Sequence, residues 1–215
     1  MTPRLRSKTL LIICLAAWLL AVGAGLRLVL SYEGTPGRAG AAPAVWPQES
    51  ALRRERGGPT LVMMVHPRCP CSRASLGELA LLMAEAQGRL GAEVVFVRPP
   101  GLPVSWERSE LWAAASRIPG VTVSVDEGGA EARRFGAETS GQVALYGADG
   151  RLLFSGGITV ARGHAGDNDG RRAIAALLAG DTPGAGDTPV FGCPIFGEAQ
   201  GAPAERSCHA KIYDK

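Results

Sequence analysis

The sequence predicts an α/β domain, with a central mixed sheet and helices on both faces, that follows one membrane-spanning helix. Short apolar runs typical of buried strands alternate with segments of helical periodicity. The last two strand-like runs are joined by an Asp-Gly turn, which is typical of a β-hairpin. An uncharged apolar stretch near the N-terminus predicts the membrane helix. The 215 residues are enough for one folded domain with additional segments.

The apolar stretch over residues 9–26 carries no charge. A hydrocarbon core of about 30 Å needs about 20 apolar helical residues, so we expect a transmembrane anchor over residues 9–30. The basic residues within residues 1–8 predict a cytoplasmic N-terminus and a domain on the periplasmic or extracytoplasmic side of the inner (cytoplasmic) membrane. The alternative is a cleaved signal peptide, because residues 21–24 include small residues that a peptidase accepts.

Three segments are expected after the anchor. Residues 31–57 combine Gly, Pro, Ala and mixed charge without a period, which predicts a flexible linker. Residues 58–180 are expected to form the folded domain, and residues 181–215 a Gly- and Pro-rich tail that contains cysteines. The net charge is +3 and no basic stripe with interleaved aromatic residues is present, so no nucleic-acid partner is expected.

The elements of the domain follow from the alternation of patterns. The strands share short apolar runs bounded by turn residues, and are expected at 60–65, 93–97, 121–125, 142–146 and 151–155. The helices share apolar residues at helical spacing, and are expected at 72–88, 106–117, 131–135 and 171–178. Strands that alternate with helices predict parallel pairing, and the closing hairpin adds antiparallel edges.

The segment 66–72, with the sequence His-Pro-Arg-Cys-Pro-Cys-Ser, joins the first predicted strand to the first predicted helix. Cys69 is therefore expected at a helix N-terminus, where the helix dipole and free N–H groups stabilise a thiolate. His66 is expected to add positive charge or to act as a base. An acidic thiol at a partly exposed site is what thiol–disulfide exchange requires.

The spacing of the two cysteines leaves two mechanisms open. A Cys69–Cys71 disulfide closes a very small ring, so it is strained and easily transferred. Alternatively, Cys69 acts as a monothiol with Ser72 at C-x-x-S spacing, and Cys71 or a tail cysteine resolves the mixed disulfide. A purely structural bridge across one residue would constrain almost no chain.

The element order, with a cysteine motif directly after the first buried strand, resembles the thioredoxin superfamily over roughly residues 59–180. The tether resembles its membrane-anchored members of the TlpA/ResA type. The histidine-led motif is similar to that of bacterial membrane proteins sometimes labelled RedB, as are the segments 155–159 and 162–168. The resemblance implies a thioredoxin-like three-layer fold. It also implies a substrate groove, for which we expect Pro67, Pro70, Ser72 and Gly141.

Two departures from that superfamily lie within the predicted domain. The second cysteine is one residue nearer to the first than usual, and Ser72 holds its usual place. Gly141 stands where the superfamily has a cis-proline; glycine tolerates unusual backbone angles, so a similar close approach is expected there.

The tail adds Cys193 and Cys208, which the core fold does not require. Exported thiols tend to oxidise, so these two residues are expected either to form a structural clasp or to place Cys193 beside Cys69 as a resolving thiol. Four exported cysteines allow three pairings, which the sequence leaves open.

The resulting hypothesis is a membrane-tethered thiol–disulfide oxidoreductase that acts on exported thiol- or disulfide-containing proteins. Cys69 is the expected nucleophile, Cys71 its resolving partner and His66 a tuning residue, and no cofactor is expected. One alternative is a copper chaperone that binds Cu(I) through Cys69, Cys71, His66 and His164, since thiolate and imidazole suit that ion. Another is a redox-inactive thioredoxin-fold binding module.

Overall fold

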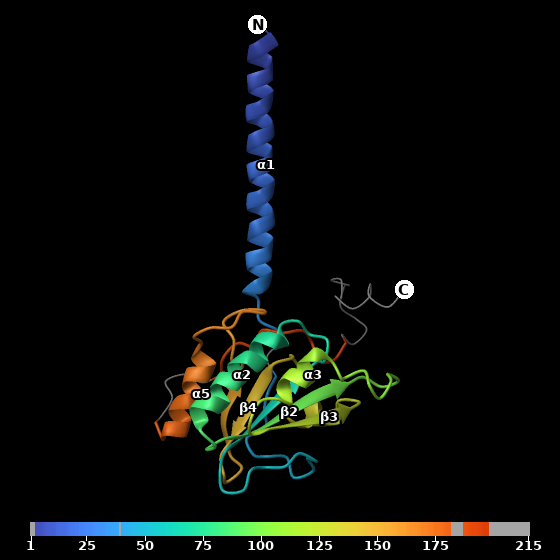
Figure 1. The fold of residues 1–215 in the computed structure, drawn as a ribbon, viewed down its shortest axis with the longest axis vertical. Coiled ribbons are helices and arrows are strands. Elements are labelled where there is room, and N and C mark those ends of the chain that lie inside the picture. The colour runs from blue at the N-terminus through green and yellow to red at the C-terminus, as the bar shows by residue number, and fades with distance from the viewer. Residues whose placement is uncertain (1–2, 39, 182–186, 198–215) are drawn as a thin grey trace.

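The structure is a computed structural model that describes residues 3–38, 40–181 and 187–197. Helix α1 (Pro3–Glu33) projects from the domain as one long rod (Figure 1). Its portion Lys8–Glu33 is long and apolar enough to cross a membrane, and none of it is buried against the domain. The helix therefore extends beyond both ends of the expected range 9–30.

The sheet has five strands in the order β3-β2-β1-β4-β5. The strands are β1 (Thr60–Val65), β2 (Gly91–Arg98), β3 (Val121–Glu127), β4 (Gln142–Tyr146) and β5 (Leu152–Gly156). The pairs β1–β2 and β2–β3 are parallel, whereas β1–β4 and β4–β5 are antiparallel. The predicted α/β fold with a mixed central sheet is confirmed.

Each parallel connection requires a crossover helix. Helix α2 (Ser72–Ala86) joins β1 to β2, and helix α3 (Glu110–Ala115) joins β2 to β3. Helix α3 is shorter than expected because Ser109 caps its N-terminus: the Ser109 side chain accepts from the N–H of Trp112. Helices α4 (Ala130–Arg134) and α5 (Asp169–Ala179) complete the set.

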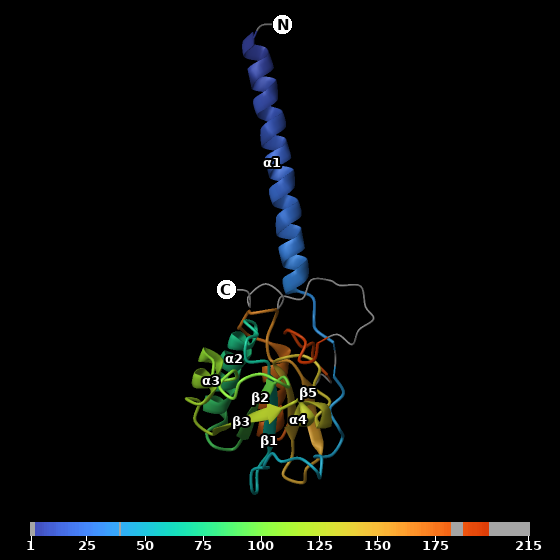
Figure 2. The ribbon, with the colours of Figure 1, turned by 90° about the vertical axis from the view of Figure 1, so that its right-hand side faces the viewer.

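Strand β1 is buried on both faces, as its continuous apolar run predicts. Its residues Leu61 and Met63 belong to the core cluster that α2, α3 and α5 cover. The alternate residues Val62 and Met64 belong to the cluster on the other face, which α4 covers. Figures 1 and 2 show this layered arrangement around the central strands.

The expectation of a flexible linker over residues 31–57 is wrong for a large part of it. The N–H of Leu152 donates to the Ala44 carbonyl and the N–H of Trp46 donates to the Gly150 carbonyl, at 2.9 and 2.8 Å. The Trp46 ring also packs edge-on against Tyr146, with ring centroids 5.2 Å apart. The short helix α4 leaves part of this sheet face open, and the linker supplies the apolar surface that closes it.

Candidate functional site

The motif occupies the turn between β1 and α2. The N–H of Cys69 donates to the His66 carbonyl at 3.0 Å, and the N–H of Ser72 donates to the Cys69 carbonyl at 3.2 Å. Cys71 precedes the helix and already has helical backbone angles (φ −64°, ψ −30°). Cys69 thus lies just before the N-terminus of a long helix, where the helix dipole favours a thiolate.

Three cysteines meet at this turn. Cys69 is fully buried, and Cys71 and Cys193 are each only 8% exposed. The backbone N–H of Cys193 donates to the Cys69 sulfur at 3.4 Å, and all three thiols are free. The expectation that Cys69 is partly exposed is wrong, because the tail segment that carries Cys193 covers it.

The three thiols of the cluster differ in pKa. The pKa of Cys69 is far below its usual value, because the thiols of Cys193 and Cys71 and the hydroxyl of Ser72 donate hydrogen bonds to its sulfur and outweigh the effect of burial. The pKa of Cys193 is raised, because its thiol donates to Cys69 and to Cys71 and is buried. The pKa of Cys71 is also raised: a hydrogen bond from Cys193 lowers it, but its own bond to Cys69 and its burial prevail. Cys69 is therefore the thiolate of the cluster.

The hydroxyl groups of Ser140 and Ser72 form a hydrogen-bonded chain next to Cys69. The N–H of His66 donates to Ser140 Oγ at 2.7 Å, and Ser140 Oγ lies 2.7 Å from Ser72 Oγ. Either hydroxyl of this pair can be the donor, and Ser72 also contributes to the lowered pKa of Cys69. Sequence reasoning missed Ser140; its only signal there is its place directly before Gly141.

His66 is held by its own turn. Its Nδ1 accepts the N–H of Arg68 at 3.2 Å, and its ring stands edge-on to Trp106 at 5.4 Å between centroids. The Arg68 guanidinium lies over the same Trp106 ring, at 5.3 Å. These contacts fix the turn that carries Cys69.

The residues expected to line a groove differ in exposure. Pro67 and Ser72 are buried, whereas Pro70 is exposed. Gly141 has φ +90°, and a Cβ there would lie 2.6 Å from Ser75 Oγ, so this position requires glycine.

The chain's own tail pairs with the edge beside Gly141. The N–H of Ser140 donates to the Cys193 carbonyl, and the N–H of Ile195 donates to the Glu138 carbonyl, both at 2.8 Å. Thr139 and Pro194 form an antiparallel bridge. Part of the expected tail over residues 181–215 is therefore packed on the domain.

Arg162 connects this tail segment to the end of α1. Its guanidinium donates to the Gly192 carbonyl and, at 2.9 Å, to the Thr35 carbonyl, and its backbone N–H donates to the Glu33 carbonyl at 3.0 Å. The same guanidinium lies 5.0 Å from the centre of the Tyr32 ring. Figure 2 shows the tail segment at the end of the domain nearest to α1.

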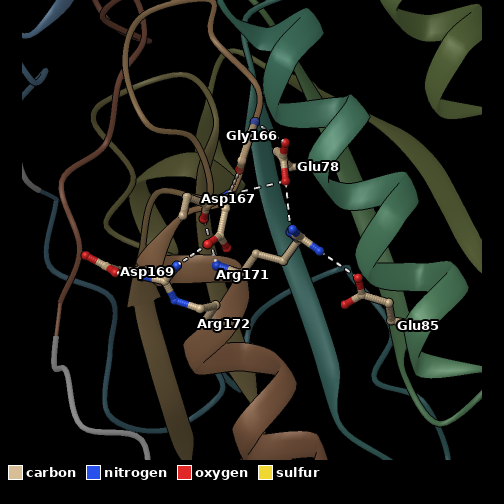
Figure 3. A network of polar contacts seen from close by, with 8 residues as sticks. Glu78, Glu85, Gly166, Asp167, Asp169, Arg171 and Arg172 are labelled. Atoms are coloured by element: carbon tan, nitrogen blue, oxygen red, sulfur yellow. Dashed lines mark hydrogen bonds and ion pairs between the residues drawn. The ribbon is translucent and has the colours of Figure 1, made fainter.

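The loop that carries Arg162 is fixed to α2 by Glu78 (Figure 3). This carboxylate is 1% exposed and accepts the Gly166 N–H at 2.7 Å and the Asn168 side-chain amide at 3.2 Å. It also pairs with Arg171 at 2.9 Å. A buried carboxylate with this set of partners holds the loop in a single position against α2.

Of the alternative copper ligands, Cys69 and Cys71 lie together, but His164 does not join them. His164 is exposed, and its Nδ1 lies 2.9 Å from the Arg162 carbonyl oxygen. Within the described ranges, no group of three or more His, Cys, Asp or Glu residues is arranged to hold a metal ion. Cys208 lies outside the described residues, so a Cys193–Cys208 clasp stays a prediction.

No family model matches the chain, and no curated protein matches it. A hypothetical protein from Sinorhizobium meliloti has a similar structure, with 22% identity and a TM-score of 0.56 over 75% of this chain and 93% of that one. An uncharacterized conserved protein from Geobacillus kaustophilus gives 16% identity and a TM-score of 0.56 over 78% and 95%. A thioredoxin-like protein in its oxidised form gives 17% identity and a TM-score of 0.44 over 69% and 97%.

The first two likenesses show a shared fold alone. The strand order places β1 at the centre of the sheet, with the cysteine turn at its carboxyl end and α2 directly after it. The chain has a thioredoxin-like fold.

Proposed function

We propose that the protein is a membrane-tethered thiol–disulfide oxidoreductase whose nucleophile is Cys69. The observation that carries the proposal is the cluster of three buried thiols at the start of α2, in which the Cys193 amide donates to the Cys69 sulfur at 3.4 Å. A thiol whose pKa is lowered, at the start of a helix, is suited to attack a disulfide.

The Cys69 thiolate attacks one sulfur of a partner's disulfide. That S–S bond breaks, a mixed disulfide forms on Cys69, and the other sulfur leaves as a thiolate that takes a proton. A second thiol of the chain then loses its proton and attacks the Cys69 sulfur, so that an internal disulfide forms and the partner leaves with both of its sulfurs reduced. Cys71, which hydrogen-bonds Cys69, is one such thiol. The reverse sequence oxidises a partner dithiol.

Helix α1 is proposed as an uncleaved anchor in the inner membrane, with the domain on the extracytoplasmic side. Its length and apolar composition support a membrane helix, and the basic residues before it support a cytoplasmic N-terminus. The partners are then exported proteins that carry a thiol or a disulfide. The resemblance to the TlpA/ResA and RedB proteins supports the same assignment.

The test is reduction of insulin by dithiothreitol, followed by turbidity, with the full-length protein in detergent. We expect catalysis by the wild type and by Cys14→Ser, whose cysteine lies in α1, and none by Cys69→Ser. Equal rates for the wild type and Cys69→Ser would contradict the proposal. Thiols that also stay unreactive to a maleimide in the folded protein would support the redox-inactive binding module.

The second candidate is delivery of Cu(I), which the contact of the soft thiols of Cys69, Cys71 and Cys193 favours, although in this structure the three are not arranged as a metal site. Copper is here the cargo, and His164 has no part in the cluster. Stoichiometric Cu(I) retention through gel filtration, lost on Cys69→Ser and unaffected by His164→Ala, would support this function over exchange chemistry.

A further inference from the structure

We propose that residues 188–196, called the strap here, act as a built-in substrate: Cys193 takes the place of a partner's cysteine over Cys69 and resolves the mixed disulfide. This inference rests on the proposed function and names the residue that completes its second step. It also states what a partner must resemble, namely an extended segment with a cysteine.

The backbone of the strap is bound as an added strand would be. It pairs antiparallel with residues 138–140 through the Cys193 carbonyl and the Ile195 N–H. Such main-chain pairing is how an extended peptide is recognised at a free strand edge. The strap therefore makes strand-like backbone bonds to the segment just before β4, directly beside Cys69.

Gly192 shows how closely the strap approaches this edge. A Cβ at this position would lie 1.9 Å from the Ser140 carbonyl oxygen, a distance that no side chain tolerates. The Arg162 guanidinium holds the Gly192 carbonyl from the other side. The strap can therefore lie this close to Ser140 only because the residue directly before Cys193 is a glycine.

The two thiols that touch Cys69 differ in their freedom to form a disulfide with it. Cys71 is two residues away along a turn that already has helical backbone angles, so a bond to Cys69 closes a strained ring. Cys193 comes from a segment 124 residues away in sequence, donates its N–H to the Cys69 sulfur and lies in the same thiol cluster. A bond between them closes no small ring.

The reaction then has a defined order of events. An incoming disulfide displaces the strap from the edge, because both need the same backbone partners and Cys69 is otherwise fully buried. Cys69 forms the mixed disulfide and releases one thiol of the partner. When the strap returns, Cys193 loses its proton to solvent and attacks the Cys69 sulfur, which forms the Cys69–Cys193 disulfide and expels the second thiol. The mixed disulfide is therefore resolved in the same step that releases the partner.

The experiment uses the full-length chain in detergent with Cys14, Cys71 and Cys208 replaced by serine, so that only Cys69 and Cys193 remain. The probe is 5,5′-dithiobis(2-nitrobenzoate), which releases a coloured thiolate at each exchange step. We expect two thiolates per chain and a protein mass lower by two hydrogens, with no adduct. With Cys193→Ser added, we expect one thiolate and a stable adduct on Cys69.

A stable adduct on Cys69 although Cys193 is present, or adducts on both cysteines, would overturn the inference and leave the proposed function intact. No reaction at Cys69 would overturn the proposed function and the inference with it.

Two glycine-to-alanine variants test the role of the strap while Cys69 and Cys193 stay in place. Gly192→Ala is expected to slow the second thiolate release at least tenfold, because the methyl group pushes the strap off its edge. Gly197→Ala lies just beyond the strap in open space and should leave both steps unchanged. Equal second-step rates for the two variants would overturn the inference.

Discussion

The backbone N–H of Cys193 donates to the sulfur of Cys69 over 3.4 Å, although 124 residues separate the two cysteines in sequence. This contact places a tail residue within the electrostatic environment of Cys69, the proposed nucleophile. The Cys193 thiol is the largest contributor to the lowered pKa of Cys69, ahead of Cys71 and Ser72. The acidity of Cys69 is thus set largely from outside its own motif.

Replacement of Cys193 by alanine should raise the pKa of Cys69 toward its usual value, because the strongest donor is lost. Because the pKa of the wild-type Cys69 thiol is lowered, its reaction with iodoacetamide should depend less on pH than that of an ordinary thiol. In the variant the rate should fall as the pH falls. Mass spectrometry of the Cys69 peptide measures both profiles, and Cys14→Ala is the control. Parallel profiles for Cys193→Ala and the wild type would contradict this role.

Ser140→Ala should break the hydroxyl chain that supports the thiolate and leave the buried N–H of His66 without its acceptor. We expect a loss of about 1–3 kcal/mol in the free energy of unfolding, together with a higher pKa of Cys69. Urea denaturation and the ultraviolet absorbance of the thiolate measure the two effects. Ser116→Ala, at an exposed helix end, is the control. A stability loss without any change in thiolate absorbance would show that Ser140 acts on the fold alone.

Glu78→Gln should destabilise the protein by roughly 3 kcal/mol, because it removes the buried charge that faces Arg171 and weakens the bonds to the loop. Glu85→Gln is the matched control: Glu85 pairs with the same arginine, but its side chain is 50% exposed, so at most about 1 kcal/mol is expected. Urea denaturation of both variants gives the comparison. Equal losses would mean that burial of Glu78 has no energetic consequence.

Glu93→Gln should stabilise the protein above neutral pH. Burial raises the pKa of Glu93 to about 7, so the folded state disfavours the carboxylate that the unfolded chain carries freely. Protonated Glu93 contributes fully to the free energy of unfolding below pH 4.5, and this contribution is lost as the pH rises through about 7. Since one pKa unit corresponds to about 1.4 kcal/mol, the gain for the variant is at most about 3 kcal/mol at high pH.

The measurement is the free energy of unfolding of Glu93→Gln and of the wild type across that pH range. Glu49→Gln, at an exposed position, should show no such crossover. A stability difference for Glu93→Gln that does not change with pH would contradict the titration.

The sequence was sufficient for the parts of the fold that depend on local patterns. The apolar run of β1 and the helical spacing of α2 predicted the elements on either side of the cysteine turn, and the position of Cys69 between them followed. The hairpin of β4 and β5 likewise followed from the Asp-Gly turn at Asp149 and Gly150.

The relationships that the sequence could not supply are long-range. Nothing local to Cys193 indicates that its carbonyl accepts from Ser140, and nothing local to Trp46 indicates that its ring covers Tyr146. Both segments are rich in Gly and Pro, a composition typical of flexible connectors, yet both bind by main-chain hydrogen bonds that any sequence can form. Composition therefore led to the wrong expectation for the linker, and it gave no sign that the tail covers Cys69.

Arg162 contacts the strap at Gly192, the last residue of α1 at Glu33, and Thr35 just after the helix. With α1 in the bilayer, as proposed, the reactive end of the domain faces the lipid headgroups and is held there. Under the proposed function, the cysteines that it meets are then those that lateral diffusion brings alongside its anchor.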